Sequence, residues 1–168
     1  MGTKEHKLRA PRSVTLGILT VSTTRTLQDD KSGLWMKKRA EKKGHDVLFH
    51  EVAPDEQEMI SGALRRLMEA HKPHAILVTG GTGIGPSDVT IEAVRPMFTK
   101  ELTAFGPLFS FLSFEEIDAA ALLSRATAGL IGQTLVFCLP GSLKACKLAC
   151  KALIFPELGH LLGHAREA

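Results

Sequence analysis

The sequence has few of the features that mark a secreted or membrane-bound protein. Its only cysteines are Cys138, Cys146 and Cys150, and an odd, sparse set fits a reducing compartment better than a disulfide framework. No apolar run approaches the roughly 20 residues that a membrane span requires, and the first residues lack the apolar stretch of a secretory signal. We therefore expect a soluble, cytoplasmic protein with no membrane partner.

The sequence also lacks the segregated positive charge of a dedicated nucleic-acid-binding protein. Its 168 residues carry a formal net charge of +3, with 44% hydrophobic and 23% charged residues. The basic cluster at 37–43 lies in an expected helix, where it would form a solvated face. Length and composition predict one globular domain at 13–168, preceded by a disordered tail at 1–12.

Patterns typical of strands and helices alternate along the domain. Short apolar runs predict strands at 14–21, 46–52, 75–79, 126–131 and 134–139. Longer segments predict helices at 33–43, 55–71, 90–98, about 114–123, 142–154 and 156–164. Asp55 and Glu58 are placed to form a capping box at the start of the second helix. The alternation predicts an α/β fold, a single three-layer α/β/α domain with a mostly parallel central sheet.

Ligands of such sheets bind beyond the carboxyl ends of the strands. The loops after the first, third and last strands, residues 22–32, 80–87 and 140–142, should meet there. The loop that starts at Ala53 should lie on the same rim. These loops are therefore the expected binding site.

The loop Gly80-Gly81-Thr82-Gly83-Ile84-Gly85 joins an expected strand to an expected helix. Glycines let backbone amides approach an anion, and the start of a helix adds unpaired amides, so the loop suits phosphate. It is neither a dinucleotide fingerprint nor a P-loop, because Pro86 stands at the position of the third glycine and Gly85 is not followed by lysine. A tight structural turn is the alternative interpretation.

Two acids are expected beside this loop. Asp88 follows the glycines, and Asp55 lies at a neighbouring strand end. Carboxylates repel phosphate unless a cation lies between them, and Mg²⁺ binds one or two carboxylates together with substrate phosphates. The alternatives are a helix cap for Asp55 and a turn acid for Asp88.

Five stretches, VAPDEQ, VTGGTGIGPSDVT, FLSFEEI, LLSRA and LPGSLKA, resemble those of the molybdenum cofactor biosynthesis family called MoaB/MogA. They occur in the family's order, and the resemblance spans most of residues 14–163. It implies a molybdopterin-binding domain of three-layer α/β fold that assembles as a trimer or hexamer. It also implies binding of molybdopterin and ATP, with Mg²⁺-assisted transfer of AMP to the pterin's terminal phosphate and release of pyrophosphate.

The resemblance also implies roles for individual residues. Asp55 and Asp88 match the two catalytic acids and would hold Mg²⁺. The residues implied to bind phosphate, pterin or nucleotide are Ser22, Arg25, Thr26, Gly80, Gly81, Thr82, Gly83, Ser87, Ser124, Arg125, Pro140, Gly141 and Ser142. Thr23 replaces an acid of the family pattern, and Ser87 replaces an arginine that would clamp phosphate. The alternative function is therefore a catalytically inactive carrier or assembly protein that binds molybdopterin.

Other pairs and clusters have simpler interpretations. Cys146 with Cys150, and His160 with His164, share helix faces at the spacing of metal ligands, but buried thiols and helix-end histidines are favoured. Trp35 would stack on a ligand ring or, the favoured interpretation, pack in the core. The phenylalanines at 105, 109, 111 and 114 are expected in the core or in a subunit interface.

Overall fold

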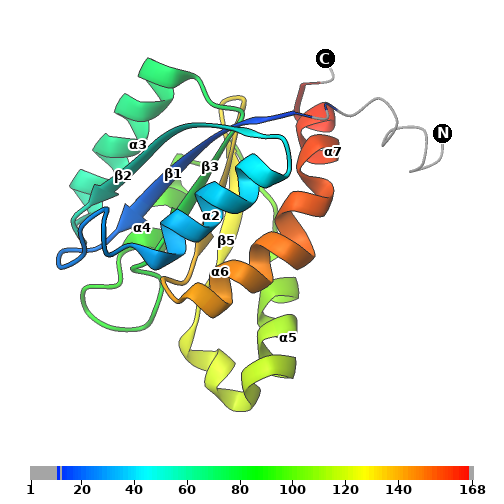
Figure 1. Ribbon diagram of the computed structural model, residues 1–168. Coiled ribbons are helices and arrows are strands. Elements are labelled where there is room, and N and C mark those ends of the chain that lie inside the picture. Colours follow the sequence, from blue (N-terminus) through cyan, green and yellow to red (C-terminus); the bar gives the residue numbers. More distant parts are fainter. Residues whose placement is uncertain (1–10, 12, 167–168) are drawn as a thin grey trace.

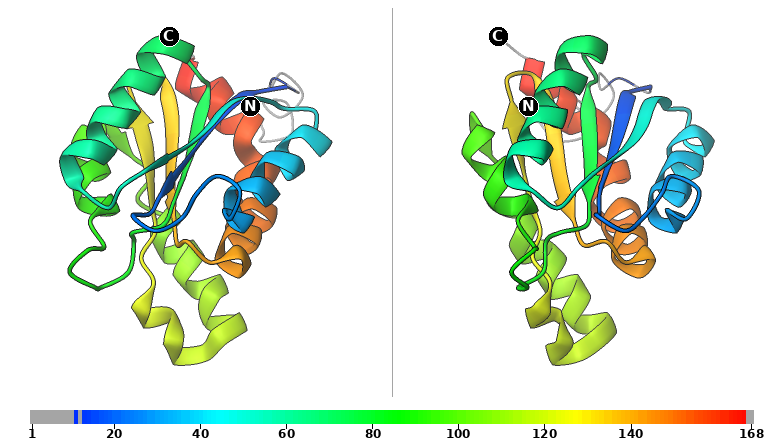
Figure 2. Two further views of the ribbon diagram at one scale, coloured as in Figure 1. Left: turned by 60° about the vertical axis from the view of Figure 1, so that its left-hand side comes forward. Right: turned by 90° about the vertical axis from the view of Figure 1, so that its left-hand side faces the viewer.

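A six-stranded sheet lies at the centre of the molecule, with helices on both faces (Figures 1 and 2). The computed structural model describes residue 11 and residues 13–166. The expected tail at 1–12 lies outside these residues apart from Pro11, so it stays a prediction. The strands are β1 (Thr15–Val21), β2 (Asp46–Ala53), β3 (Ala75–Thr79), β4 (Lys100–Glu101), β5 (Thr127–Ile131) and β6 (Thr134–Leu139).

The sheet is mostly parallel, as the sequence predicts. Its strand order is β2-β1-β3-β6-β5-β4, in which β2, β1, β3 and β6 are parallel and β5 runs antiparallel to both of its neighbours, β6 and β4. Every residue of β3 and β6 is buried, because strands covered by helices on both faces need apolar side chains on both sides. The tight turn at Gly132, where φ is +59°, makes β5 and β6 a hairpin.

Two apolar clusters, one on each face of the sheet, form the core. On one face, α2 (Lys31–Lys42), α6 (Leu143–Ala149) and α7 (Phe155–Arg166) cover Leu16, Ile18 and Phe137. On the other face, α3 (Gln57–His71) and α4 (Thr90–Val94) cover Leu19 and Val78. The short 3₁₀ turn η1 (Arg95–Met97) follows α4. The three-layer α/β/α architecture is therefore confirmed.

The segment between η1 and β5 differs from the prediction. The expected helix at about 114–123 is instead α5 (Phe105–Ile117), followed by the 3₁₀ segment η2 (Asp118–Leu123), and the edge strand β4 was not expected. Apolar residues occur all around α5, so no periodic face marks its start in the sequence. Its end is set by Asp118, whose φ of +51° breaks the helical path. Together α5 and η2 project beyond the sheet (Figure 1).

The two helices expected at 142–154 and 156–164 are one continuous helical segment. A π-helical turn, η3 (Cys150–Ile154), joins α6 to α7. Pro156 lacks an amide hydrogen and would break a regular helix, but it lies in the first turn of α7, directly after the wider π turn. None of the described helices is long and apolar enough to cross a bilayer.

The burial of two residues of α3 predicts that truncating them will change the free energy of unfolding by different amounts. Leu64 is fully buried against the second cluster, whereas the Met59 side chain is about half exposed. We expect Leu64→Ala to lower the free energy of unfolding by about 2–5 kcal/mol because it leaves a cavity. Met59→Ala is the matched control and should change this free energy by less than about 0.5 kcal/mol. Urea denaturation measures both values, and equal losses would contradict the packing of α3.

Candidate functional site

A cavity of about 370 Å³ opens at the carboxyl ends of β1, β3 and β6, where the sequence places the binding loops. The three loops meet there, with the loop after β2 on the same rim, so this geometric expectation is confirmed. The predicted residues that line the cavity are Ser22, Arg25, Asp55, Gly80, Gly81, Thr82, Gly83, Asp88, Ser124, Pro140 and Gly141. Val21, which directly precedes the first loop, and Thr24, which lies in it, also line the cavity and were not among the predicted residues.

The glycine loop has a backbone that other residues would adopt only under strain. Gly80 and Gly81 have φ values of +99° and +63°. A Cβ atom on Gly80 would lie 2.3 Å from the carbonyl oxygen of Val21. Glycine is therefore required at Gly80 both for its conformation and for its contact with the end of β1.

The amides of residues 81–84 have no hydrogen-bond acceptor among the described residues. Within the same part of the chain, the hydroxyl oxygen Oγ1 of Thr82 is buried without a partner. Groups of this kind normally bind water, an ion or a ligand, because an unpaired buried polar group is costly. A run of free amides beside a cavity is the arrangement that binds phosphate oxygens.

Asp55 does not cap α3, so the expected capping box is wrong. Glu56 occupies the cap position and makes no capping hydrogen bond. The Oδ2 atom of Asp55 instead accepts hydrogen bonds from the amide and the hydroxyl of Thr23, at 2.6 and 2.9 Å. Thr23, which replaces an acid of the family pattern, therefore ties the first loop to Asp55.

Asp88 folds back onto the glycine loop. Its Oδ2 atom accepts a hydrogen bond from the amide of Gly85 at 2.8 Å. In both Asp55 and Asp88, the other carboxylate oxygen, Oδ1, makes no hydrogen bond or ion pair within the described chain. Each acid thus orders a loop with one oxygen and has the other available at the cavity.

Four predicted residues do not line the cavity. The Thr26 hydroxyl donates to Asp29, the Ser142 hydroxyl caps α6 by accepting from the amide of Ala145, and Ser87 is exposed. Arg125, which the resemblance implies to bind a ligand, also lies outside the residues that line the cavity. Its guanidinium donates to carbonyls of the glycine loop and to the carboxylate of Glu92. Arg25 is the cationic side chain that lines the cavity.

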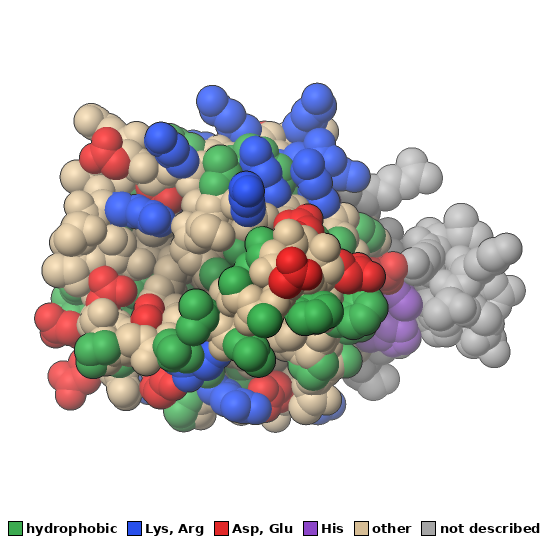
Figure 3. All heavy atoms as spheres, turned by 90° about the horizontal axis from the view of Figure 1, so that it is seen from below, with side chains coloured by type: hydrophobic (Ala, Val, Ile, Leu, Met, Phe, Trp, Pro, Cys, Tyr) green, Lys and Arg blue, Asp and Glu red, His purple; other side chains and the backbone are tan. Residues whose placement is uncertain are grey.

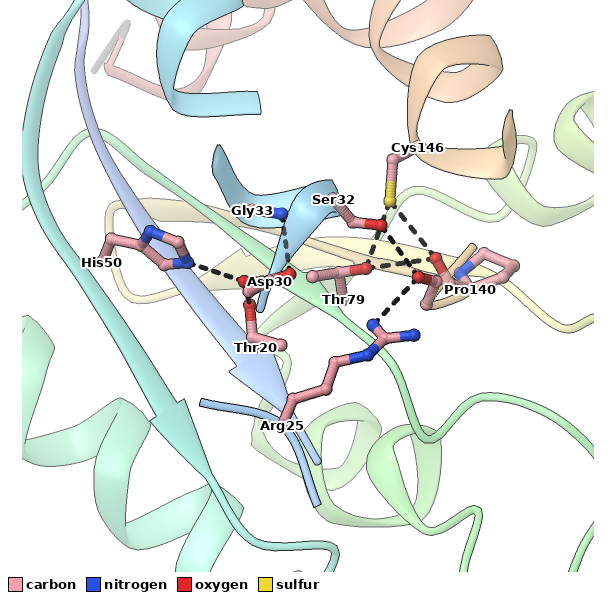
Figure 4. A network of polar contacts seen from close by, with 10 residues as sticks. Thr20, Arg25, Asp30, Ser32, Gly33, His50, Thr79, Pro140 and Cys146 are labelled. Atoms are coloured by element: carbon pink, nitrogen blue, oxygen red, sulfur yellow. Dashed lines mark hydrogen bonds and ion pairs between the residues drawn. The ribbon is translucent and has the colours of Figure 1, made fainter. Parts of the chain in front are cut away.

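Hydrogen bonds from side chains of four residues hold the turn after β6 (Figure 4). The carbonyl of Gly141 accepts hydrogen bonds from Ser32 Oγ at 2.9 Å and from Arg25 Nη1 at 3.2 Å. The carbonyl of Pro140 accepts from Thr79 Oγ1 at 3.1 Å and from the thiol of Cys146 at 3.3 Å. Burial raises the pKa of Cys146, so its thiol stays protonated and acts as a donor.

Asp30 is the buried centre of this network. It caps α2 by accepting from the amide of Gly33, and it also accepts from Thr20 and, at 2.7 Å, from Nε2 of His50 (Figure 4). Burial acts to raise the pKa of Asp30, but these hydrogen bonds outweigh it and lower the pKa to about 2. The charged carboxylate therefore fixes the start of α2, and with it the position of Ser32.

Comparison with known proteins identifies the family of this chain. Residues 17–160 match the family described as "Probable molybdopterin binding domain". The chain is 45% identical over 168 residues to molybdenum cofactor biosynthesis protein B of Bacillus subtilis (strain 168), with 99% of each chain covered. The chain belongs to the MoaB/MogA family of molybdenum cofactor biosynthesis proteins. It therefore carries a molybdopterin-binding domain and has a role in molybdenum cofactor biosynthesis.

Solved structures of MoaB proteins share its fold. A crystal structure of molybdenum cofactor biosynthesis protein B superimposes with a TM-score of 0.89 at 42% identity, covering 93% of this chain and 98% of that one. The tungsten cofactor synthesizing protein MoaB from Pyrococcus furiosus gives a TM-score of 0.81 at 39% identity, covering 94% and 100%. The resemblance that the sequence motifs indicated is thus confirmed.

Several side chains outside the cavity can be compared with their expected roles. Cys146 and Cys150 are buried free thiols, as expected. Trp35 packs against the core, with the ammonium groups of Lys147 and Lys151 about 6 Å from its ring centre. Of the four phenylalanines, those at 105 and 109 are buried and those at 111 and 114 are exposed.

The low pKa of Asp30 predicts a loss of stability in acid. A group with a lowered folded-state pKa stabilises the fold above its ordinary pKa, here 3.8, and this contribution disappears as the pH falls to about 2. A shift of this size is worth about 2 kcal/mol. We expect wild type to exceed Asp30→Asn in free energy of unfolding at pH 7 and to lose most of that excess by pH 2. Urea titrations across this range test it, and a constant difference would contradict it.

Proposed function

We propose that the chain is a molybdopterin adenylyltransferase, which binds molybdopterin and ATP and transfers AMP to the terminal phosphate of the pterin. One observation carries this proposal. The amides of residues 81–84 have no acceptor in the described chain, and residues 81–83 line the same cavity as Asp55 and Asp88, each of which has one carboxylate oxygen that no described residue engages. Amides suit phosphate oxygens and carboxylates suit a divalent cation.

The two carboxylates are suitable ligands for Mg²⁺. Mg²⁺ commonly takes one or two carboxylates and fills its remaining positions with substrate phosphates and water, so two acids suffice. Asp55 and Asp88 would hold the ion through the Oδ1 atoms that no described residue engages. When bound, the ion would neutralise charge that develops on the phosphates.

Adenylyl transfer depends mainly on the alignment of the two phosphorylated substrates, and the residues of this cavity are suited to hold them. An oxygen of the pterin phosphate forms a bond to the α-phosphorus of ATP, and the bond from that phosphorus to the β-bridging oxygen breaks, releasing pyrophosphate. The attacking oxygen is already anionic, so no base is needed. The chain would supply the glycine-loop amides and Arg25 to hold phosphates in line and to stabilise charge on the leaving pyrophosphate.

The alternative function is a molybdopterin-binding carrier or assembly protein that does no chemistry. The observation that favours it is the bond between Thr23 and Asp55, which occupies one oxygen of a proposed metal ligand. The exposed Ser87 also provides no planar clamp for a phosphate. A carrier would bind the pterin through the same amides without using both acids.

We also propose that the chain acts as a trimer or hexamer. An apolar surface formed by α5 and η2 contains Phe111, Phe114 and Leu122, whose side chains are 61%, 55% and 83% exposed. Seen from the side on which α5 projects, hydrophobic side chains gather on this surface (Figure 3). Apolar patches of this kind are typical of subunit interfaces.

Asp88→Asn tests the catalytic proposal. We expect purified wild type to release pyrophosphate from labelled ATP when molybdopterin and Mg²⁺ are present, and the variant to be slower by about 100-fold or more. Its amide oxygen can still accept from Gly85, so the loop and the melting temperature should be retained, but the negative charge is lost. The control is Asp46→Asn, an exposed acid at the opposite end of the sheet. If the wild-type protein binds the pterin but releases no pyrophosphate, the result supports the carrier function and contradicts adenylyl transfer.

The mass of the protein in solution tests the oligomer. We expect sedimentation equilibrium at micromolar concentration to give three or six chains. Replacing Phe111 and Leu122 together by serine should shift the mass toward a single chain, because it removes exposed apolar area. Met59→Ser, at a half-exposed site on α3, is the control. A single-chain mass for wild type would refute the oligomer.

A further inference from the structure

Two residues outside the glycine loop hold the carbonyl groups of its first four residues, 80–83. Thr90, the first residue of α4, donates from Oγ1 to the carbonyl of Gly80 at 2.7 Å and from its amide to that of Gly81 at 2.9 Å. Arg125 donates from Nε to the carbonyls of Thr82 and Gly83, at 3.1 and 3.0 Å. Four consecutive carbonyls therefore have donors on the side of Thr90 and Arg125.

This arrangement fixes the direction of the free amides. A trans peptide unit is planar, so the N–H of one residue points opposite to the C=O of the residue before it. Holding the carbonyls of residues 80–83 thus directs the amides of residues 81–84 away from Thr90 and Arg125. These are the same four amides that lack an acceptor in the described part of the chain.

Glu92 holds Arg125 in place. Both of its carboxylate oxygens accept from Arg125, from Nη1 at 2.5 Å and from Nη2 at 3.2 Å. The Nη2 group also donates to the carbonyl of Asp88 at 3.2 Å, so Arg125 spans both ends of the loop. The hydrogen bond from Arg125 lowers the pKa of Glu92, which keeps this partner ionised at neutral pH. A guanidinium can make these bonds together because its donors are arranged in a planar fork.

We propose that Thr90 and Arg125, with Glu92 as the support of Arg125, are positioning residues that orient the amides of residues 81–84 toward a bound anion. The inference rests on the proposed function only in taking that anion to be a phosphate of the ligand. Arg125 acts through the backbone of the loop and does not touch the phosphate. A lysine at this position would keep the charge but lose the fork.

Binding of inorganic pyrophosphate, measured by calorimetry on the full chain, tests this role. We expect Arg125→Lys and Thr90→Val to weaken binding by about tenfold or more, because the first removes the donor to the carbonyls of residues 82 and 83 and the second removes the donor to the carbonyl of Gly80. Thr90→Ser keeps the hydroxyl and should bind within about twofold of wild type. The matched control is Arg66→Lys, which breaks another bidentate arginine–glutamate pair, with Glu51, away from the cavity.

A second measurement without ligand separates this inference from the proposed function. Nitrogen-15 relaxation should show lower order parameters for the amides of residues 81–84 in Arg125→Lys and Thr90→Val than in wild type. Unchanged affinity and unchanged order in both variants would overturn the inference, as would equal losses in Arg66→Lys. If wild type binds no pyrophosphate, the anion site of the proposed function fails, and the order parameters still decide whether the two residues orient the loop.

Discussion

Parallel pairing of β1, β3 and β6 is the constraint on which the site depends, because it brings three loops that are distant in sequence to one edge of the sheet. Thr79 is paired on one side with Thr20 and on the other with Leu139. Directly beyond these pairs, the amide of Gly80 donates to the carbonyl of Leu139 at 3.0 Å. A slip of one residue in either pairing would turn the buried side chains to the wrong face and separate the loops.

The carbonyls and the amides of the glycine loop have separate roles. The carbonyls of residues 80–83 accept hydrogen bonds from Thr90 and Arg125, whereas the amides of residues 81–84 bind no other described residue. A loop held in this way does not need to reorganise when an anion arrives, which is how preorganised dipoles stabilise charge.

Hydrogen bonding also separates the structural acid of this region from the ligand-binding candidates. Asp30 is buried and accepts from three groups, so its charge is fully used inside the protein. Asp55 and Asp88 are only partly buried, and each uses one oxygen to order a loop. This division lets the same two side chains set the shape of the cavity and offer oxygen ligands to a cation.

By itself, the sequence determined the alternation of strands and helices, the edge of the sheet at which the loops meet, and the family. These follow from local patterns, because buried strands need continuous apolar runs and phosphate loops need glycine. Only the tertiary structure decided that Asp55 binds Thr23 rather than capping α3, that Arg125 binds the glycine loop rather than the cavity, and that Asp30 anchors α2. The bonds of Asp55 and Arg125 join segments far apart in the chain, and the local cap by Asp30 is completed by Thr20 and His50 on neighbouring strands. Side-chain type alone does not reveal which of several partners a polar group will meet.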